Sequence, residues 1–239
     1  MANEEIIEVK NLVVKYKDVV AVNNVSFSVK KNEVIGIIGA NGAGKTSLVE
    51  AIEGLRTPSG GEISILGLNP QKDRIALYNQ VGVQLQQTSY PEHAKVQDVC
   101  KLFSCFYTNP LPFDELLVSM GIDGLKNKYV NKLSGGQRQR LSIVLSLLCR
   151  PKIVFWDELT TGLDPLARHT LYDKILQYKR DGLTIIIVTH FMEEVEKLCD
   201  RVVVMQAGKM IGIGTPTEIT KLFHAASLDD VFTQISSVV

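Results

Sequence analysis

Residues 34–47 read VIGIIGANGAGKTS, and the rest of the chain can be interpreted outward from them. The run from Val34 to Gly39 is almost continuously apolar, which predicts a parallel strand that helices cover on both faces. The residues from Gly39 to Thr46 fit G-x-x-x-x-G-K-[ST], and TSLVEAIEG after them predicts a helix. A strand, a glycine-rich loop and a helix in this order predict a phosphate-binding loop; the alternative is a glycine-rich turn with a solvated lysine.

Other segments predict two further kinds of strand and a helical region. The apolar runs KIVFWD (152–157) and TIIIVTH (184–190) predict two more buried parallel strands, each ending in polar residues. Most of the first seventy residues instead alternate between apolar and polar side chains, which is typical of antiparallel strands with one wet face. Residues 88 to about 150 contain helical stretches and no convincing strand. We therefore expect an α/β fold with a mostly parallel P-loop NTPase core, an N-terminal antiparallel β subdomain and an inserted α-helical subdomain.

The glycine-rich loop supplies candidate ligands for a nucleotide and its metal. Backbone N–H groups of the loop would surround the phosphates, Lys45 would neutralise the β and γ oxygens, and Thr46 would bind Mg²⁺. The loop residues expected at the nucleotide are Gly39, Asn41, Gly42, Ala43, Gly44, Lys45, Thr46 and Ser47.

Polar residues that follow the two other buried strands are candidates for the same site. Ligand sites of open parallel sheets gather at the carboxyl ends of strands. We assign Asp157 as a second Mg²⁺ ligand and Glu158 as the base that accepts a proton from an attacking water. His190 can reach a γ-phosphate from the end of its strand. Taken alone, the acidic pair would as often begin a helix, and His190 would more often bond to backbone.

A second glycine-rich segment, NKLSGGQRQRLS at 131–142, allows two interpretations. Ser134 and Gln137 have the spacing of a capping box, in which each side chain bonds to the backbone of the other residue. A cap does not require the pair Gly135 and Gly136, and bare N–H groups at a helix start can bind an anion. The segment therefore predicts a helix start that could also bind phosphate.

The charge balance, the cysteine spacing and the length of the apolar runs argue against several classes of protein. Twenty-six basic residues balance twenty-six acidic ones, so we expect no nucleic-acid partner. The four cysteines contain no CxxC pair, which argues against a zinc site and a disulfide framework and favours a reducing cytoplasm. No apolar run approaches the roughly 18 residues of a membrane span, and the acidic N-terminus is unlike a signal peptide. If the protein works at a membrane, another chain must supply the membrane part.

Taken together, these motifs resemble the nucleotide-binding subunits of ABC transporters over almost the whole chain. LSGGQ at 133–137 is similar to the signature loop of that family, and Tyr16 to the aromatic residue that stacks on adenine. Gln86 is similar to the glutamine that senses Mg²⁺ and water, and Asp164 to the aspartate of the D-loop. One departure is Leu159, where the family usually has proline, and we expect this change to loosen the D-loop.

The resemblance implies a motor subunit that hydrolyses ATP with Mg²⁺. In this family the signature loop faces the phosphate loop of a second subunit, so Ser134, Gly135, Gly136 and Gln137 would contact ATP bound by a partner, in a homodimer. We expect one ABC ATPase domain over residues 1–226, a short tail over 227–239, and a location at the inner face of the cell membrane through an integral-membrane subunit. The tail resembles those of ABC-2 type exporters, although a short amphipathic closing helix explains it equally well. An importer subunit, or a soluble ABC ATPase without a transport role, is the alternative.

Overall fold

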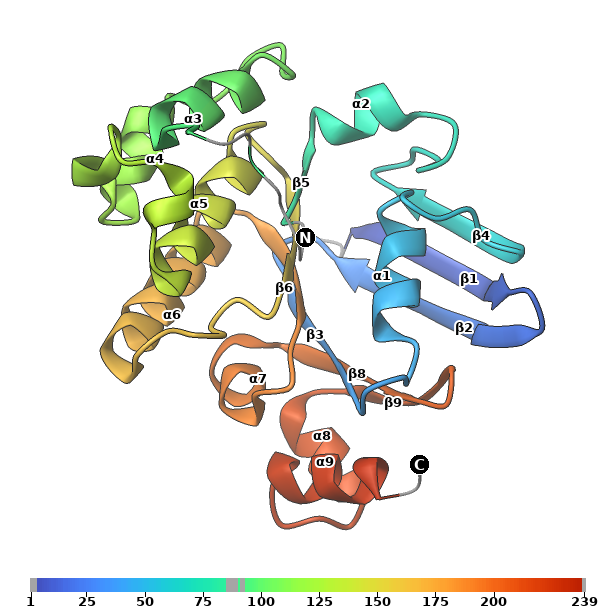
Figure 1. Cartoon of the computed structure of the whole chain (residues 1–239). Helices are drawn as coiled ribbons and strands as arrows, with labels where there is room; N and C mark the ends of the chain where they lie inside the picture. The colour runs from blue at the N-terminus through green and yellow to red at the C-terminus, as the bar shows by residue number, and fades with distance from the viewer. Residues whose placement is uncertain (1–3, 85–89, 91–92, 238–239) are drawn as a thin grey trace.

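The computed structural model describes residues 4–84, 90 and 93–237 of the chain. They form a small sheet, a large sheet and helices that cover both (Figure 1). The α-helices are α1 Lys45–Ile52, α2 Arg74–Tyr78, α3 Val96–Ser104, α4 Phe113–Ser119, α5 Gly135–Leu147, α6 Pro165–Arg180, α7 Met192–Leu198, α8 Pro216–Leu222 and α9 Leu228–Ser236. Two short 3₁₀ helices, Asp123–Leu125 and Val130–Lys132, lie between α4 and α5.

The small sheet is antiparallel and has the strand order β2-β1-β4. Its strands are β1 Glu5–Tyr16, β2 Val19–Lys30 and β4 Gly60–Ile65. In β2 the side chains of Val25 and Val29 are buried while Ser26 is exposed, because successive side chains of a strand point to opposite faces. The alternating pattern of the sequence therefore predicts this sheet correctly.

The large sheet has the order β5-β6-β7-β3-β8-β9. All neighbouring strands pair in parallel except β9, which is antiparallel to β8. The strands are β3 Val34–Gly39, β5 Val81–Val83, β6 Ile153–Asp157, β7 Thr184–Val188, β8 Arg201–Gln206 and β9 Lys209–Gly214. The three apolar runs of the sequence thus form β3, β6 and β7, side by side at the centre of the sheet.

The core lies on both faces of the large sheet. Ile35 and Ile37 of β3 pack with the small sheet and α1, whereas Val34 and Ile38 pack with the helices on the other face. All six residues of β3 are buried, so every side chain of the strand faces apolar neighbours. This explains why a buried parallel strand has a continuous apolar sequence rather than an alternating one.

The region between β5 and β6 is helical, as expected. Its described residues contain α3, α4 and α5 and no named strand, and Figure 1 shows these helices grouped on the side of the large sheet away from the small sheet. The expected fold class is therefore confirmed.

The apolar run IVLSLLC at 143–149 is the buried end of α5 and the residues just after it. None of the described helices is long and apolar enough to cross a membrane.

Two helices close the chain beside β8 and β9 (Figure 1). In α9, Leu228, Val231 and Ile235 are buried in the same core cluster as the helices of the insertion. Gln206 of β8 also donates from Nε2 to the carbonyl of Ile235 at 3.2 Å. The last residues described thus pack as an amphipathic helix against the sheet.

Candidate functional site

The glycine-rich loop between β3 and α1 has the conformation that its sequence requires. Gly39 and Gly44 have φ values of 156° and 97°, and Gly44 is the N-cap of α1. A Cβ atom on Gly39 would collide with the carbonyl oxygen of Met205, and one on Gly44 with that of Ala21. Only glycine fits at both places, so the neighbouring backbones fix the path of the loop.

Lys45 is the first residue of α1, and its ammonium group turns back into the loop. Its Nζ donates to the carbonyl oxygens of Gly39 at 2.7 Å and Ala40 at 2.9 Å. Burial lowers the pKa of Lys45, whereas the nearby carboxylates of Asp157 and Glu158 raise it. A positive charge is thus placed at a helix N-terminus, where the free N–H groups already favour anions.

The ends of three neighbouring strands contribute to one cavity of about 270 Å³ beside this loop. The loop after β3 contributes Lys45 and Thr46, the end of β6 contributes Asp157 and Glu158, and the residues after β7 contribute Thr189 and His190. The full set of lining residues is Ala21, Asn41, Gly42, Gly44, Lys45, Thr46, Ser47, Asp157, Glu158, Val188, Thr189 and His190. The structure therefore brings together the residues that the three strand ends predict.

Glu158 and His190 lie close to each other at this cavity. Nδ1 of His190 is 3.3 Å from Oε1 of Glu158, and both side chains are a little under half exposed. Glu158 has a φ of 50°, which is uncommon for a residue other than glycine, and its N–H donates to the carbonyl of Val188 at 2.9 Å. This backbone bond to β7 holds the glutamate in an unfavourable conformation beside the histidine.

Tyr16 lies at the end of β1, next to the glycine-rich loop. Its hydroxyl is 3.1 Å from the Oγ of Ser47, and its side chain is 39% exposed. The guanidinium carbon of Arg56 lies 4.2 Å from the centre of its ring. An exposed aromatic ring is thus placed within reach of a nucleotide whose phosphates occupy the loop.

The segment around Ser134 begins α5 and forms the capping box that its sequence predicts. Ser134 Oγ accepts from the N–H of Gln137 at 3.2 Å, and the Ser134 N–H donates to Oε1 of Gln137 at 3.1 Å. Ser134, Gly135, Gly136 and Gln137 are not among the described residues that line the cavity. Within one chain, therefore, this loop does not contribute to the pocket that contains Lys45.

The start of α5 instead contacts the segment that follows β6. Nε2 of Gln139 donates to the carbonyl oxygen of Glu158 at 3.2 Å. A Cβ atom on Gly136 would lie 2.8 Å from Cδ2 of Leu163, so glycine allows a close approach there. The second glycine-rich loop is thus connected to the backbone of Glu158, although its own side chains lie outside the cavity.

Comparison with known proteins decides the family. Residues 22–161 match the family described as ABC transporter. The chain belongs to the ABC transporter family. Over 216 residues, 88% of this chain and 71% of the relative, it is 38% identical to the Nod factor export ATP-binding protein I of Burkholderia orbicola. Against the protein of the same name from Rhizobium meliloti the identity is 35%, over 88% of this chain and 64% of the relative.

A third ABC relative and two solved structures agree with this assignment. The chain is 32% identical over 90% of its length to the "Probable multidrug ABC transporter ATP-binding protein YbhF" of Escherichia coli, of which it spans 38%. The structure of an ATP-binding subunit of an ABC transporter aligns with a TM-score of 0.87 and 28% identity, over 96% of this chain and 99% of that one. For cbiO1 of Clostridium perfringens, part of the complex cbiONQ, the TM-score is 0.78 and the identity 30%, over 91% of each chain. The protein is therefore an ATP-binding subunit with the ABC ATPase fold.

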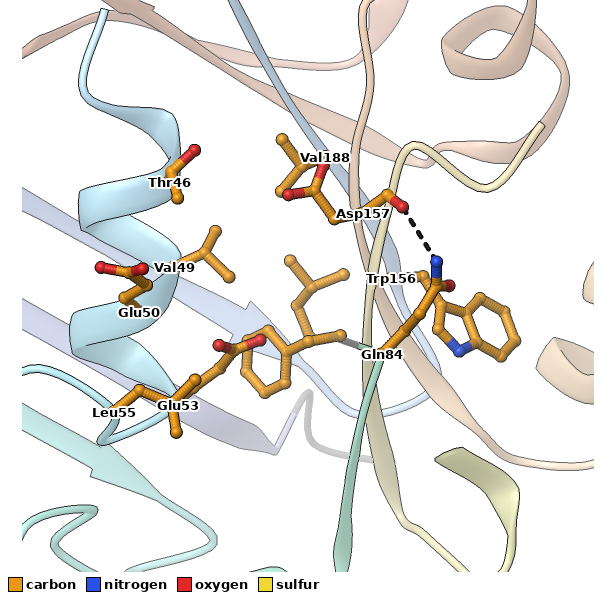
Figure 2. Close-up of a pocket in the computed structure, with 11 residues that line it drawn as sticks. Thr46, Val49, Glu50, Glu53, Leu55, Gln84, Trp156, Asp157 and Val188 are labelled. Atoms are coloured by element: carbon orange, nitrogen blue, oxygen red, sulfur yellow. Dashed lines mark hydrogen bonds between the residues drawn. The ribbon is translucent and has the colours of Figure 1, made fainter. Parts of the chain in front are cut away.

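The oxygen donors of this ABC subunit fit a Mg²⁺ ion. The Thr46 hydroxyl and the Asp157 carboxylate extend from α1 and β6 toward the same space (Figure 2). Mg²⁺ prefers hard oxygen ligands, and it usually takes one or two from protein and the rest from water and phosphate. Among the described residues no group of three His, Cys, Asp or Glu side chains could enclose a metal. Thr46 and Asp157 thus offer two oxygen donors, and water and phosphate would supply the other ligands of an ion placed there.

Asp164, Leu159 and Gln86, which the resemblance singles out, are not among the described residues that line the cavity. Asp164 is the N-cap of α6, where its carboxylate accepts from the N–H of Ala167 at 2.9 Å, and it does not line the cavity as described. Leu159, at the position where the resemblance leads one to expect proline, is 1% exposed and packs in the helical core. Apolar packing therefore holds the leucine side chain in place. Gln86 lies outside the described residues.

A second, smaller cavity adjoins Thr46 and Asp157, the candidate metal ligands, and the sequence gives no signal for it. It has a volume of about 90 Å³ and is lined by Thr46, Glu53, Gln84 and Asp157 among others (Figure 2). Nε2 of Gln84 donates to the backbone carbonyl of Asp157 at 3.1 Å. Burial, with a smaller effect of the Asp157 and Glu50 charges, raises the pKa of Glu53 to about 8. Gln84 thus fixes the end of β6, and the environment of Glu53 in the same cavity favours its neutral form.

A buried polar contact also joins the segment after β6 to α7, the helix that follows His190. The Thr160 hydroxyl donates to Oε1 of Glu194, and both residues are 0% exposed. Burial raises the pKa of Glu194, while its bonds to Thr160 and Thr189 lower it. Because Thr189 adjoins His190, one glutamate on α7 contacts both the segment after β6 and the residues before His190. The sequence around Glu194 does not indicate that this glutamate joins two loops, because an isolated glutamate in a helical segment is usually exposed.

Proposed function

We propose that this ABC subunit hydrolyses Mg-ATP to drive export through a separate membrane subunit, as one half of a head-to-tail homodimer. The cavity at the ends of β3, β6 and β7 is the observation that carries the proposal. It combines a lysine at a helix N-terminus, two oxygen donors for a metal, and a glutamate beside a histidine. These are the groups that phosphoryl transfer to water requires.

The residues of the cavity have separate roles in this proposal. Lys45 stabilises negative charge on the β and γ oxygens, and the backbone N–H groups of residues 41–46 surround the phosphates. Glu158 accepts the proton of the attacking water, and His190 contacts the γ-phosphate. Thr46 and Asp157, with Gln86, would hold a Mg²⁺ ion, which when bound would supply positive charge to the phosphate oxygens. The Glu158 backbone, bonded to β7 and to Gln139, keeps the base in place.

The proposed dimer is supported by the separate positions of the two glycine-rich loops. Ser134 and its neighbours begin a helix but do not line the cavity of their own chain. The capping box uses the N–H groups of Ser134 and Gln137, and in this proposal the N–H groups of Gly135 and Gly136 bind a phosphate held by a partner. Charge-assisted hydrogen bonds contribute about 1.5 to 3 kcal/mol each. Two or three of them across the interface would change the rate at least about a hundredfold. Hydrolysis should therefore depend on the dimer.

Export and a membrane partner are supported by relatives and by one exposed groove. The Nod factor and YbhF relatives are named for export or multidrug transport, and none of the described helices could span the bilayer. A groove of about 430 Å³ lies between α2 and the residues after α3, where Ile75 and Phe106 are 85% and 67% exposed. We propose this groove as the surface for a cytoplasmic segment of the membrane subunit, at the inner face of the membrane.

The replacement Lys45→Ala tests the catalytic half of the proposal. It removes the cation at the phosphate oxygens, so we expect ATP hydrolysis by the purified chain to fall at least about a hundredfold and ATP binding to weaken. Phosphate release and nucleotide titration measure the two effects. Lys152→Ala, at a surface lysine that bonds to Gln80, serves as the control and should keep normal turnover. Equal turnover in both variants would reject the assignment of the loop.

A further inference from the structure

Tyr16 makes two contacts that hold its side chain in place, and both lead back to helix α1. Its hydroxyl contacts Ser47 Oγ at 3.1 Å, and Ser47 is in the first turn of α1. One face of its ring is covered by the guanidinium of Arg56, 4.2 Å from the ring centre. Arg56 in turn is bound to Glu50, which also belongs to α1. Residues three apart on a helix share a face, so Ser47 and Glu50 lie on one side of α1.

The guanidinium of Arg56 is itself held in place by several bonds. Its Nε and Nη2 are each 2.8 Å from Oε2 of Glu50. The backbone N–H of Arg56 donates to the carbonyl of Glu50 at 3.0 Å, and Gln71 Nε2 donates to the carbonyl of Arg56 at 2.7 Å. A guanidinium fixed by such bonds forms a flat, rigid surface behind an aromatic ring.

We propose that Arg56, held by Glu50, positions the Tyr16 ring so that the adenine of ATP stacks on its opposite, exposed face. This inference rests on the proposed function, because it concerns the base of the nucleotide whose phosphates bind the loop. Helix α1, which begins with Lys45 and Thr46 at the phosphates, then also holds the Tyr16 ring on which adenine stacks. Holding the ring in its bound orientation before the nucleotide arrives reduces the entropy lost on binding. Arg56 is a positioning residue in this arrangement and touches no reacting atom.

The test compares binding of ADP, which carries the base, with binding of inorganic tripolyphosphate, which does not. Arg56→Met keeps the length of the side chain but removes the flat charge behind the ring. We expect its Kd for ADP, measured by calorimetry, to rise about 3- to 10-fold. Tripolyphosphate affinity and kcat for ATP should stay within about twofold. Arg180→Met, at an exposed arginine on the last turn of α6, is the control and should change neither.

A combined replacement shows whether Arg56 acts through Tyr16. Tyr16→Ala should weaken ADP binding by itself, and adding Arg56→Met to it should then weaken ADP binding no further. An unchanged or lower Kd for ADP in Arg56→Met would overturn the inference, because the arginine would then be irrelevant or would cover the face that adenine needs. A parallel loss of tripolyphosphate binding would also overturn it. The wild-type and Lys45→Ala activities report on the proposed function separately, since neither depends on Arg56.

Discussion

Glu53 shows, at the scale of a single residue, how a buried acid makes stability depend on pH. The side chain is 6% exposed beside the small cavity of Figure 2, and burial raises its pKa to about 8. An unfolded glutamate titrates near 4.5. Between these two values the folded chain binds one proton more than the unfolded chain, so its free energy of unfolding falls as pH rises through this window.

We predict that Glu53→Gln removes this pH dependence. Each unit of pKa difference corresponds to about 1.4 kcal/mol, so the wild type should lose on the order of 4 kcal/mol relative to the variant between pH 4.5 and pH 8. Urea unfolding at several pH values without nucleotide or Mg²⁺ measures the difference. Glu115→Gln, at an exposed glutamate of α4, is the control and should follow the wild type. Parallel curves for the wild type and Glu53→Gln would mean that Glu53 is already ionised in the folded chain.

At the scale of elements, α2 and the residues after α3 form the groove proposed for the membrane subunit. Leu55, Tyr78 and Tyr107 line it together with the exposed Ile75 and Phe106. One aromatic residue next to the groove belongs to the internal packing. The ring of Phe103 lies edge-on to that of Phe106, with 5.9 Å between the ring centres, and it packs on the helical core. The groove thus has exposed apolar side chains, and one of them, Phe106, rests against a residue packed on the core.

We predict that a cysteine at Ile75 crosslinks to the membrane subunit when the two are produced together. Cys105 is exposed beside Phe106 and the other three cysteines are buried, so the experiment requires a Cys105→Ser background. Val118→Cys, at a similarly exposed apolar residue on α4, is the control and should not crosslink. Crosslinking from Val118 but not from Ile75 would place the partner on another face. Mass spectrometry of the crosslinked product identifies the partner segment.

At the scale of the whole molecule, one chain contains two glycine-rich loops that do not meet, and we propose that each is one half of an ATP site. Lys45 lines the cavity, whereas Ser134 caps α5 outside it. Glu158→Gln keeps the shape of the side chain but cannot accept the proton, so ATP should bind and remain uncleaved. We predict that this variant elutes as a dimer from a sizing column with ATP and as a monomer with ADP.

A second replacement tests the role of the loop in that dimer. Ser134→Arg places a bulky side chain where the partner's phosphate would lie, so Glu158→Gln combined with Ser134→Arg should remain monomeric with ATP while still binding nucleotide. Loss of the helix cap alone costs about 1 kcal/mol. Ser227→Arg removes an equivalent cap from α9 and should leave the dimer intact. An ATP-dependent dimer of unchanged stability with Ser134→Arg would reduce the loop to a helix cap.

The sequence by itself determines the sheet core and most of the cavity. β3, β6 and β7 follow from apolar runs because a strand covered on both faces needs an apolar side chain at every position. Lys45, Asp157 and His190 follow from their places at the strand ends, since the ends of parallel strands meet at one edge of a sheet. These inferences depend only on local patterns.

The tertiary structure alone decides the contacts between segments that are distant along the chain. Arg56 covers Tyr16, Gln84 holds the end of β6, and Glu194 binds Thr160. Isolated arginine, glutamine and glutamate residues are usually solvated, so no local pattern distinguishes these three. Their roles arise because packing of the two sheets and the helices places each side chain against a partner and excludes water, where a hydrogen bond or a charge has a larger effect than at the surface.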